Sequence, residues 1–168
     1  MAEKTSLRDY QRELAERLRG AERGRAASKL GLLVGDESWL VDLADVAEVI
    51  PVPVIAPVSL TQAWFKGVAN IRGNLYSVVD LPAFLGHGRV ILVGQARLLL
   101  VAERFRLGTA LLVDRSLGLR SSAQLRRREV GATARWSRSE YDDLEGRHWI
   151  ELDVPQLVRH PEFLAVEI

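Results

Sequence analysis

The sequence predicts a mainly β fold made of two small, similar units, and three features of the chain lead to this prediction. Short apolar segments recur at close spacing between Gly, Pro and Asp turns, which is typical of small barrels or sandwiches. Helical patterns are too sparse for a parallel sheet in which strands and helices alternate. A block of strand patterns also occurs twice along the chain, which indicates two similar lobes rather than a solenoid.

The internal repeat is clearest in its second part. The run IRGNLYSVVDLPAFL aligns without a gap on LEGRHWIELDVPQLV, 73 positions further along the chain. The alignment pairs three identical residues of the turn and helix-start type: Gly73 with Gly146, Asp80 with Asp153, and Pro82 with Pro155. Leu32–Val34 also aligns with Leu99–Val101, at an offset of 67. We therefore expect the same strand framework to be used twice.

The chain begins with a predicted helix over Ser6–Arg19, capped by Ser6 and stopped at Gly20. Its apolar residues form a narrow stripe on a charged rod: Leu7, Tyr10, Leu14 and Leu18. Such a helix is expected to pack on its own body; a docking helix for a partner and a membrane-surface helix are the alternatives. Residues 20–28 are expected to form a linker, so residues 1–29 are a helix with its linker and residues 30–168 one domain of two lobes.

Within the domain, strands are predicted over Leu32–Val34 and Trp39–Leu43, and a third ends at Pro51 and Pro53, which cannot donate to a ladder. In this third strand Val46, Glu48 and Ile50 are expected to share one face. A short helix is predicted to start at Ser59 or Thr61. The segment 67–85 then reads as a hairpin with a tight turn at Gly73-Asn74, followed by a helix that Asp80 caps and Pro82 begins.

In the second half, residues 120–140 predict a short helix or an extended loop, and residues 142–154 return to strand. A helical turn is expected over Pro155–Val158, with Asp153 as its N-cap. The tail 163–168 is expected to be a last strand or an arm lying on the body.

Composition excludes several classes of function. There are no cysteines, which excludes disulfides and thiolate chemistry. The net charge of +1 creates no overall electrostatic field that would attract nucleic acid. No apolar run approaches the ~20 residues of a membrane span and no signal peptide is evident, so we expect a cytoplasmic protein without direct membrane insertion. The three histidines share no ligand spacing, and no nucleophile motif or phosphate loop occurs; no enzyme, metal or cofactor is predicted.

A nucleic-acid-binding β-barrel is the alternative function. The only basic cluster is Arg126–Arg128, and Trp136 nearby could offer a stacking surface. Further basic residues close to the cluster are Arg120, Arg135 and Arg138. Acidic residues dilute it: Glu129, Glu140, Asp142 and Asp143. A solvated face is the favoured interpretation of this cluster.

Residues 67–81, read as G-V-x-N-x-R-G-x-x-x-x-V-V-D-L, resemble the signature of the CheW-like coupling domain. The segments SLTQAWFKG and NLYSVVD, before and within this signature, resemble the PilI type of the family, found in twitching-motility (type IV pilus) chemosensory systems. This resemblance implies two five-stranded, SH3-like β-barrels. It also implies a non-catalytic adaptor that couples the cytoplasmic tip of a chemoreceptor to the regulatory domain of a CheA-type histidine kinase. The charged N-terminal helix is a departure, since minimal members of the family lack it.

The resemblance also implies a receptor- or kinase-binding set on the first of the two lobes: Val46, Glu48, Gly67, Asn70, Arg72 and Gly73. Glu48 and Arg72 match positions that affect receptor signalling in the family, and Val46 matches a receptor-contact position. An arginine fork anchored to a carboxylate on a neighbouring strand would fix a docking surface. The alternative is an ion pair that only pins two strands together. Gly67 and Gly73 also have a simpler interpretation as turn glycines.

Overall fold

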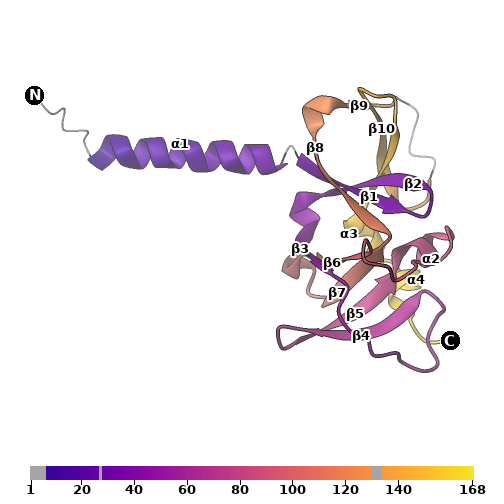
Figure 1. Cartoon of the computed structure of the whole chain (residues 1–168). Helices are drawn as coiled ribbons and strands as arrows, with labels where there is room; N and C mark the ends of the chain where they lie inside the picture. Colours follow the sequence, from indigo (N-terminus) through magenta and orange to yellow (C-terminus); the bar gives the residue numbers. More distant parts are fainter. Residues whose placement is uncertain (1–6, 27, 130–133) are drawn as a thin grey trace, which may run out of the picture.

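The computed structural model of the chain describes residues 7–26, 28–129 and 134–168. It consists of a long N-terminal helix and two β-sheets, each forming one lobe of the body (Figure 1). In chain order the elements are α1 (Leu7–Ala26), β1 (Ser28–Val34), β2 (Glu37–Asp42), η1 (Leu43–Asp45), β3 (Val46–Pro51), β4 (Phe65–Ile71), β5 (Asn74–Asp80), α2 (Leu81–Leu85), β6 (Arg97–Val101), η2 (Glu103–Phe105), β7 (Thr109–Val113), β8 (Arg115–Ser121), η3 (Ser122–Gln124), β9 (Leu125–Arg127), β10 (Ser137–Asp143), β11 (His148–Leu152), α3 (Val154–Leu157) and α4 (Pro161–Leu164). The predicted mainly β, two-lobe fold with an N-terminal helix and short connecting helices is confirmed.

The two sheets have matching topologies. Lobe A has the strand order β8-β1-β2-β11-β10-β9 and lobe B the order β3-β6-β7-β5-β4. One parallel pair lies inside each lobe, β2 with β11 in lobe A and β7 with β5 in lobe B, and the other pairs are antiparallel. In this arrangement β1 corresponds to β6 and β11 to β5, as the two alignments of the repeat predict.

The repeats and the lobes are not the same units, however. Lobe A takes β1 and β2 from the first half of the chain and β8 to β11 from the second. Lobe B takes β3, β4 and β5 from the first half and β6 and β7 from the second. Each half therefore contributes strands to both lobes, and the lobes cannot form independently of one another.

Both sheets are closed by a strand that bends from one neighbour to another. In lobe A this strand is interrupted by η3, so that β8 pairs with β1 and β9 pairs with β10, which gives six strands instead of the expected five. In lobe B the chain beyond β3 continues to Ala56, which forms an isolated bridge with Val68 of β4. Closure in this way leaves few free strand edges.

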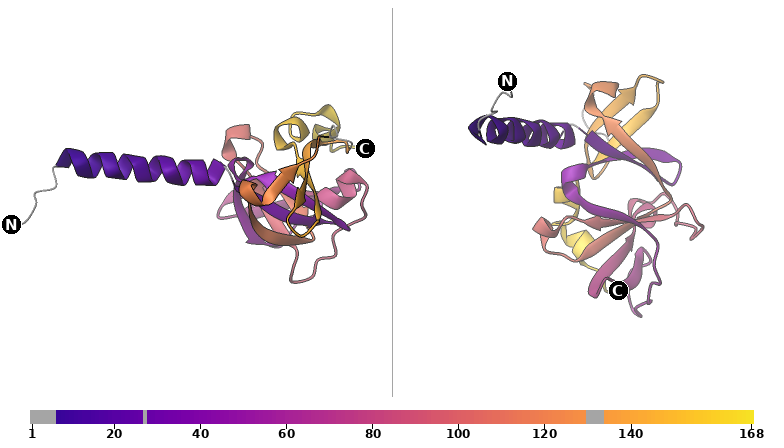
Figure 2. Two further views of the ribbon diagram at one scale, coloured as in Figure 1. Left: turned by 90° about the horizontal axis from the view of Figure 1, so that it is seen from above. Right: turned by 60° about the vertical axis from the view of Figure 1, so that its left-hand side comes forward.

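The main hydrophobic core lies where the two lobes meet. Buried side chains of β1 and β2 pack there against side chains of β6 and β7, with Leu32, Val41, Leu99 and Leu111 all at most 2% exposed. A smaller apolar cluster fills lobe B, including Leu98, Leu112 and partly buried Ile50. The mutual core explains why the lobes form one body in all views (Figure 2).

Both predicted N-caps are confirmed. Asp80 accepts a hydrogen bond from the backbone N–H of Ala83 at 3.2 Å, and Asp153 accepts one from Gln156 at 3.0 Å. Asp80 is fully buried and also accepts from the N–H of Val90, so it fastens the connection that follows α2. Burial raises the pKa of this carboxyl above its ordinary value.

Helix α1 differs from the prediction. It continues through Gly20 to Ala26, so most of the predicted linker is helical; the predicted cap Ser6 lies outside the described residues. Gly20 has open space around it, and the cost of a glycine inside a helix, ~1 kcal/mol relative to Ala, does not end it. The helix projects from the body instead of packing on it (Figures 1 and 2), with Leu14 46% and Leu18 58% exposed.

Two further predictions of local structure are resolved. The helix predicted at Ser59 or Thr61 is absent: the chain there is irregular, and Thr61 forms a bridge with Glu167. The tail is therefore an arm on the body, as one of the two alternatives predicted, after the short helix α4. Among the described helices, none combines the length and the apolar character that a membrane-spanning segment needs.

Candidate protein-docking site on lobe B

The turn between β4 and β5 carries the central residues of the predicted site. Ile71 pairs with Asn74, so the two turn residues are Arg72 and Gly73 rather than Gly73 and Asn74. Both have positive φ, 52° for Arg72 and 86° for Gly73, as a type I′ turn requires. The twist of this turn matches that of the flanking strands, which is why an arginine accepts the left-handed conformation here.

Asn70 stabilises this turn through its side chain. Its side-chain oxygen accepts a hydrogen bond from the backbone N–H of Gly73 at 2.9 Å. A short amide side chain that bonds the backbone a few residues on is typical of a tight turn. Asn70 therefore shapes the tip of the hairpin and fixes the direction in which Arg72 leaves it.

Arg72 forms a two-point ion pair with Glu48. Its two terminal nitrogens donate to the two carboxylate oxygens of Glu48 at 2.7 and 2.6 Å. The side chains are 72% and 37% exposed, so the pair lies at the surface and joins the hairpin to β3. The bonds from Arg72 lower the pKa of Glu48, which keeps the carboxylate ionised. The predicted constellation is thus brought together, on lobe B.

Val46 does not share the face of Glu48, contrary to the prediction. A β-bulge between the two residues shifts the register, because Val46 pairs with Val101 whereas Glu48 pairs with Leu100. Val46 and Val49 consequently pack against the core between the lobes. The predicted alternation failed because a bulge adds one residue to the strand and turns Val46 to the other side.

Gly67 is in β4 and lies against Ala56, in the segment that closes lobe B. It is buried with a φ of 127°, and a Cβ atom added to it would lie 2.0 Å from the carbonyl oxygen of Ala56. Ala56 and Val68 exchange two backbone hydrogen bonds at this crossing. Gly67 therefore permits a close backbone approach and positions the hairpin, while the surface of the site belongs to Glu48, Arg72 and their neighbours.

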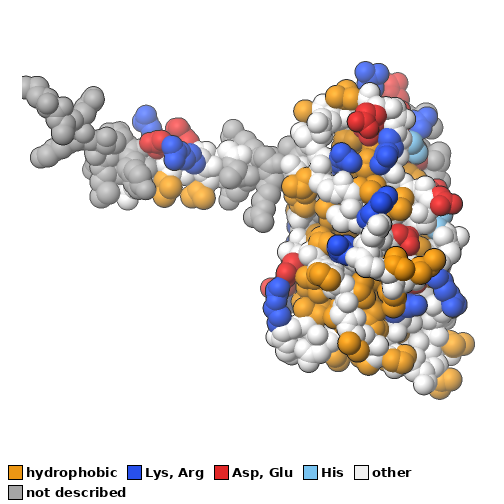
Figure 3. Space-filling model, in the orientation of Figure 1, with side chains coloured by type: hydrophobic (Ala, Val, Ile, Leu, Met, Phe, Trp, Pro, Cys, Tyr) orange, Lys and Arg blue, Asp and Glu red, His pale blue; other side chains and the backbone are white. Residues whose placement is uncertain are grey.

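Leu75 is a surface residue that the sequence did not single out. It pairs with exposed Asn70 next to the turn and is 66% exposed. Cross-strand partners point to the same face of a sheet, so the pairing of Leu75 with polar Asn70 indicates that Leu75 is exposed. Further exposed apolar residues lie in the connections of lobe B: Val54, Leu60, Ile91, Leu92 and Val93. Figure 3 shows hydrophobic side chains over this half of the body. Exposed apolar groups of this kind suit protein docking.

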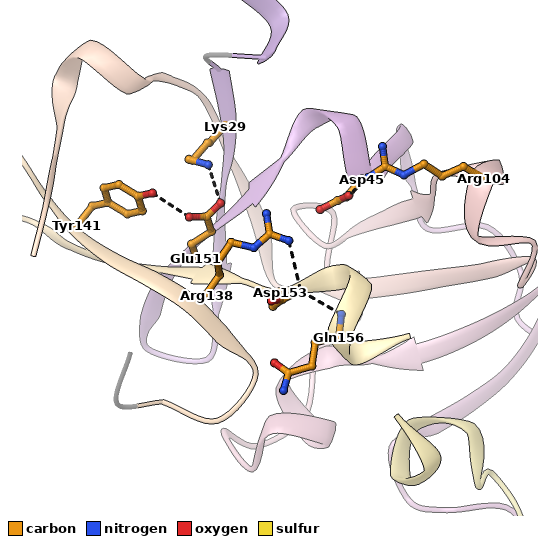
Figure 4. Close-up of polar contacts among 8 residues, drawn as sticks. All are labelled: Lys29, Asp45, Arg104, Arg138, Tyr141, Glu151, Asp153 and Gln156. Carbon is orange, nitrogen blue, oxygen red and sulfur yellow. Dashed lines mark hydrogen bonds and ion pairs between the residues drawn. The ribbon is translucent and has the colours of Figure 1, made fainter. Parts of the chain in front are cut away.

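Lobe A contains a buried polar network of a different character (Figure 4). Glu151 is 2% exposed, binds Lys29 at 2.6 Å and accepts a hydrogen bond from the Tyr141 hydroxyl at 2.9 Å. Burial, together with the bond to Glu151, raises the pKa of Tyr141. Nearby, buried Asp45 of η1 pairs with Arg104 of η2, in the β6–β7 connection. These contacts join strands and connections of the body to one another.

The basic cluster of the alternative function lies on β9. There Arg126 and Arg127 pair in register with Asp142 and Tyr141 of β10, and Arg128 contacts Asp142 at 3.7 Å. Trp136 is only 6% exposed, so it offers no free stacking face. In the parts of the chain that the structure covers, no cluster of three or more His, Cys, Asp or Glu could hold a metal ion.

Comparison with known proteins agrees with this architecture. The model of the family described as CheW-like domain matches residues 29–162. The protein PilI of Pseudomonas aeruginosa is 34% identical over 92 residues, which cover 55% of this chain and 51% of PilI. The chain thus aligns with about half the length of that relative. The crystal structure of the scaffolding protein TtCheW from Thermoanaerobacter tengcongensis has the same fold, with a TM-score of 0.67 and 17% identity, covering 82% of this chain and 95% of that one. With its two interleaved β-lobes and a family match over most of its length, the chain belongs to the CheW-like domain family.

Proposed function

We propose that this chain is a non-catalytic adaptor that couples the cytoplasmic tip of a chemoreceptor to the regulatory domain of a CheA-type histidine kinase. The twitching-motility (type IV pilus) version of such a system is the favoured setting, because the chain is similar to PilI. Membership of the CheW-like family supports the adaptor role.

The observation that carries the receptor contact is the exposed two-point pair of Glu48 with Arg72. The turn at Arg72-Gly73 and the bond from Gly73 to Asn70 constrain the backbone of Arg72, and the pair with Glu48 orients its guanidinium before any partner arrives. A docking group that is already ordered loses little conformational entropy on binding. With Leu75 alongside, the surface combines a fixed charge pattern with an apolar contact.

Receptor binding tests this role with three variants. Arg72→Ala and Glu48→Lys are expected to reduce capture of a receptor cytoplasmic fragment while the thermal unfolding temperature changes little. Arg128→Ala, which removes a comparable exposed contact in lobe A, is the matched control and is expected to bind normally. Full receptor binding by folded Arg72→Ala and Glu48→Lys variants would refute the proposed contact.

A charge-swapped variant separates docking from a purely structural pair. Glu48→Arg combined with Arg72→Glu keeps two opposite charges in place but reverses their positions. If the pair only pins β3 to the hairpin, the swap should restore both stability and binding. The docking role predicts stability close to that of the wild type with binding still impaired, because the partner meets the opposite charge pattern.

A further inference from the structure

Helix α1 presents an apolar side that the body does not cover. Leu14 and Leu18, one turn apart, are 46% and 58% exposed, and the space-filling view shows hydrophobic side chains along one side of the described part of the helix (Figure 3). The opposite side holds the exposed pair Arg12–Glu16. Soluble helices normally bury such a stripe against a neighbouring surface. Because α1 leaves the body, the described residues of the body do not supply that neighbour.

The distribution of charge along the helix indicates which neighbour fits. Residues 7–16 hold two basic and three acidic residues, a net charge of −1, and residues 17–26 hold four basic and one acidic, a net charge of +3. A second copy running antiparallel places the negative half of each helix against the positive half of the other. A parallel copy would place the two +3 halves together.

The position of the body gives an independent reason for the antiparallel arrangement. The C-terminal end of α1 meets the body and its N-terminal end points away from it (Figures 1 and 2). A helix of 20 residues is ~30 Å long, so an antiparallel pair holds the two bodies at opposite ends without contact. In a parallel pair both bodies would start from the same end and compete for the same space.

We propose that α1 is a self-association helix, which pairs antiparallel with α1 of a second copy so that Leu14 of each copy lies against Leu18 of the other. The pair would link two adaptor bodies through a rod separate from the docking surface on lobe B. This proposal does not depend on the receptor or kinase contacts.

Sedimentation equilibrium of the full chain tests the association. The average mass is expected to rise towards twice that of one chain as concentration increases. Leu14→Gln with Leu18→Gln keeps residues of good helix propensity and is expected to weaken association about tenfold or more. The control Arg12→Gln with Glu16→Gln changes the opposite side, leaves the net charge of residues 7–16 at −1, and is expected to associate like the wild type. A chain that stays monomeric, or a control that loses association equally, would overturn the proposal.

Cross-linking tests the orientation of the two helices. The chain has no cysteine, so disulfides can form only between the introduced residues. Leu14→Cys and Leu18→Cys proteins are mixed and oxidised. The antiparallel pair predicts a mixed disulfide between position 14 of one copy and position 18 of the other. Predominant 14–14 and 18–18 products, as in a parallel pair, would overturn it, and so would an absence of cross-linking. The proposal would also be overturned if the chain stays monomeric but binds a receptor fragment or anionic vesicles, and loses this binding in the Leu14→Gln, Leu18→Gln variant. Helix α1 would then be assigned to that partner.

Discussion

Gly67 and Gly73 lie in the same hairpin and both have positive φ, but for different physical reasons. At Gly67 the carbonyl oxygen of Ala56 occupies the space where a Cβ atom would be, whereas nothing lies within 4 Å of a Cβ at Gly73. The first glycine therefore permits two chain segments to touch, and the second only permits a backbone conformation. At the scale of single residues, the shape of the docking surface thus depends on backbone geometry as much as on charge.

This contrast predicts the effect of adding one methyl group. Gly67→Ala should lower the free energy of unfolding by about 3 kcal/mol or more, because the chain that closes lobe B has to move. Gly73→Ala should cost only roughly 1–2 kcal/mol, the strain of a left-handed residue. Urea unfolding of both variants measures the difference. Equal losses would mean that the crossing at Ala56 is not a tight contact.

Tyr141 predicts a pH dependence at the alkaline end. Its pKa in the folded protein is raised by burial and by the bond to Glu151. Above the ordinary tyrosine pKa of about 10, the unfolded chain loses the hydroxyl proton while the folded chain keeps it, so the unfolded state binds fewer protons and stability falls as pH rises. Tyr141→Phe should make the alkaline part of the stability curve flatter. An unchanged alkaline slope in this variant would contradict the assignment.

At the scale of elements, each lobe is held by a different kind of contact. Lobe B is filled by apolar side chains such as Leu98 and Leu112. Lobe A holds fully buried Trp149 against Gly31, together with the charged pair of Lys29 and Glu151. Two lobes of one topology can thus be filled in chemically different ways.

The buried pair predicts an asymmetry between single and combined substitutions. Glu151→Leu alone should destabilise the protein by about 3–5 kcal/mol, because it leaves Lys29 charged and without its partner inside lobe A. Replacing all three members, by Lys29→Met, Glu151→Leu and Tyr141→Phe, should recover most of this loss. Chemical denaturation gives both values, and Glu162→Gln serves as the exposed control, expected to cost less than ~1 kcal/mol. A triple variant no more stable than Glu151→Leu would contradict the desolvation argument.

At the scale of the whole molecule, the exchange of strands makes the two halves of the chain interdependent. Lobe A lacks four of its strands without the second half, and lobe B lacks two. The main core is also shared between the lobes. Cooperative folding of the body as one unit follows from this sharing.

Cutting the chain in the exposed connection between α2 and β6 tests this interdependence. Fragments 1–94 and 95–168 should each lack a cooperative thermal transition, since each would expose the shared core and unpaired strand edges. Mixing them should restore β-sheet circular dichroism and a single transition. If either fragment unfolds cooperatively on its own, the lobes are more independent than their strand order indicates.

The sequence predicted the parts of the structure that depend on local chemistry. The repeat, the caps at Asp80 and Asp153 and the pairing of Glu48 with Arg72 followed from residue type, spacing and resemblance to a family. Three features could not be predicted in this way. The bulge that turns Val46 inward and the exchange of strands between halves depend on tertiary pairing. The direction of α1 depends on which surfaces the body leaves for it, which no periodicity encodes.

In the proposed adaptor role, one chain holds a receptor and a kinase together. A receptor cytoplasmic fragment on beads, incubated with the regulatory domain of a CheA-type kinase, measures this directly. The adaptor role predicts that the kinase domain is retained only when the chain is added, and that Arg72→Ala lowers retention while Arg128→Ala does not. Equal retention with and without the chain, or none with it, would contradict the account.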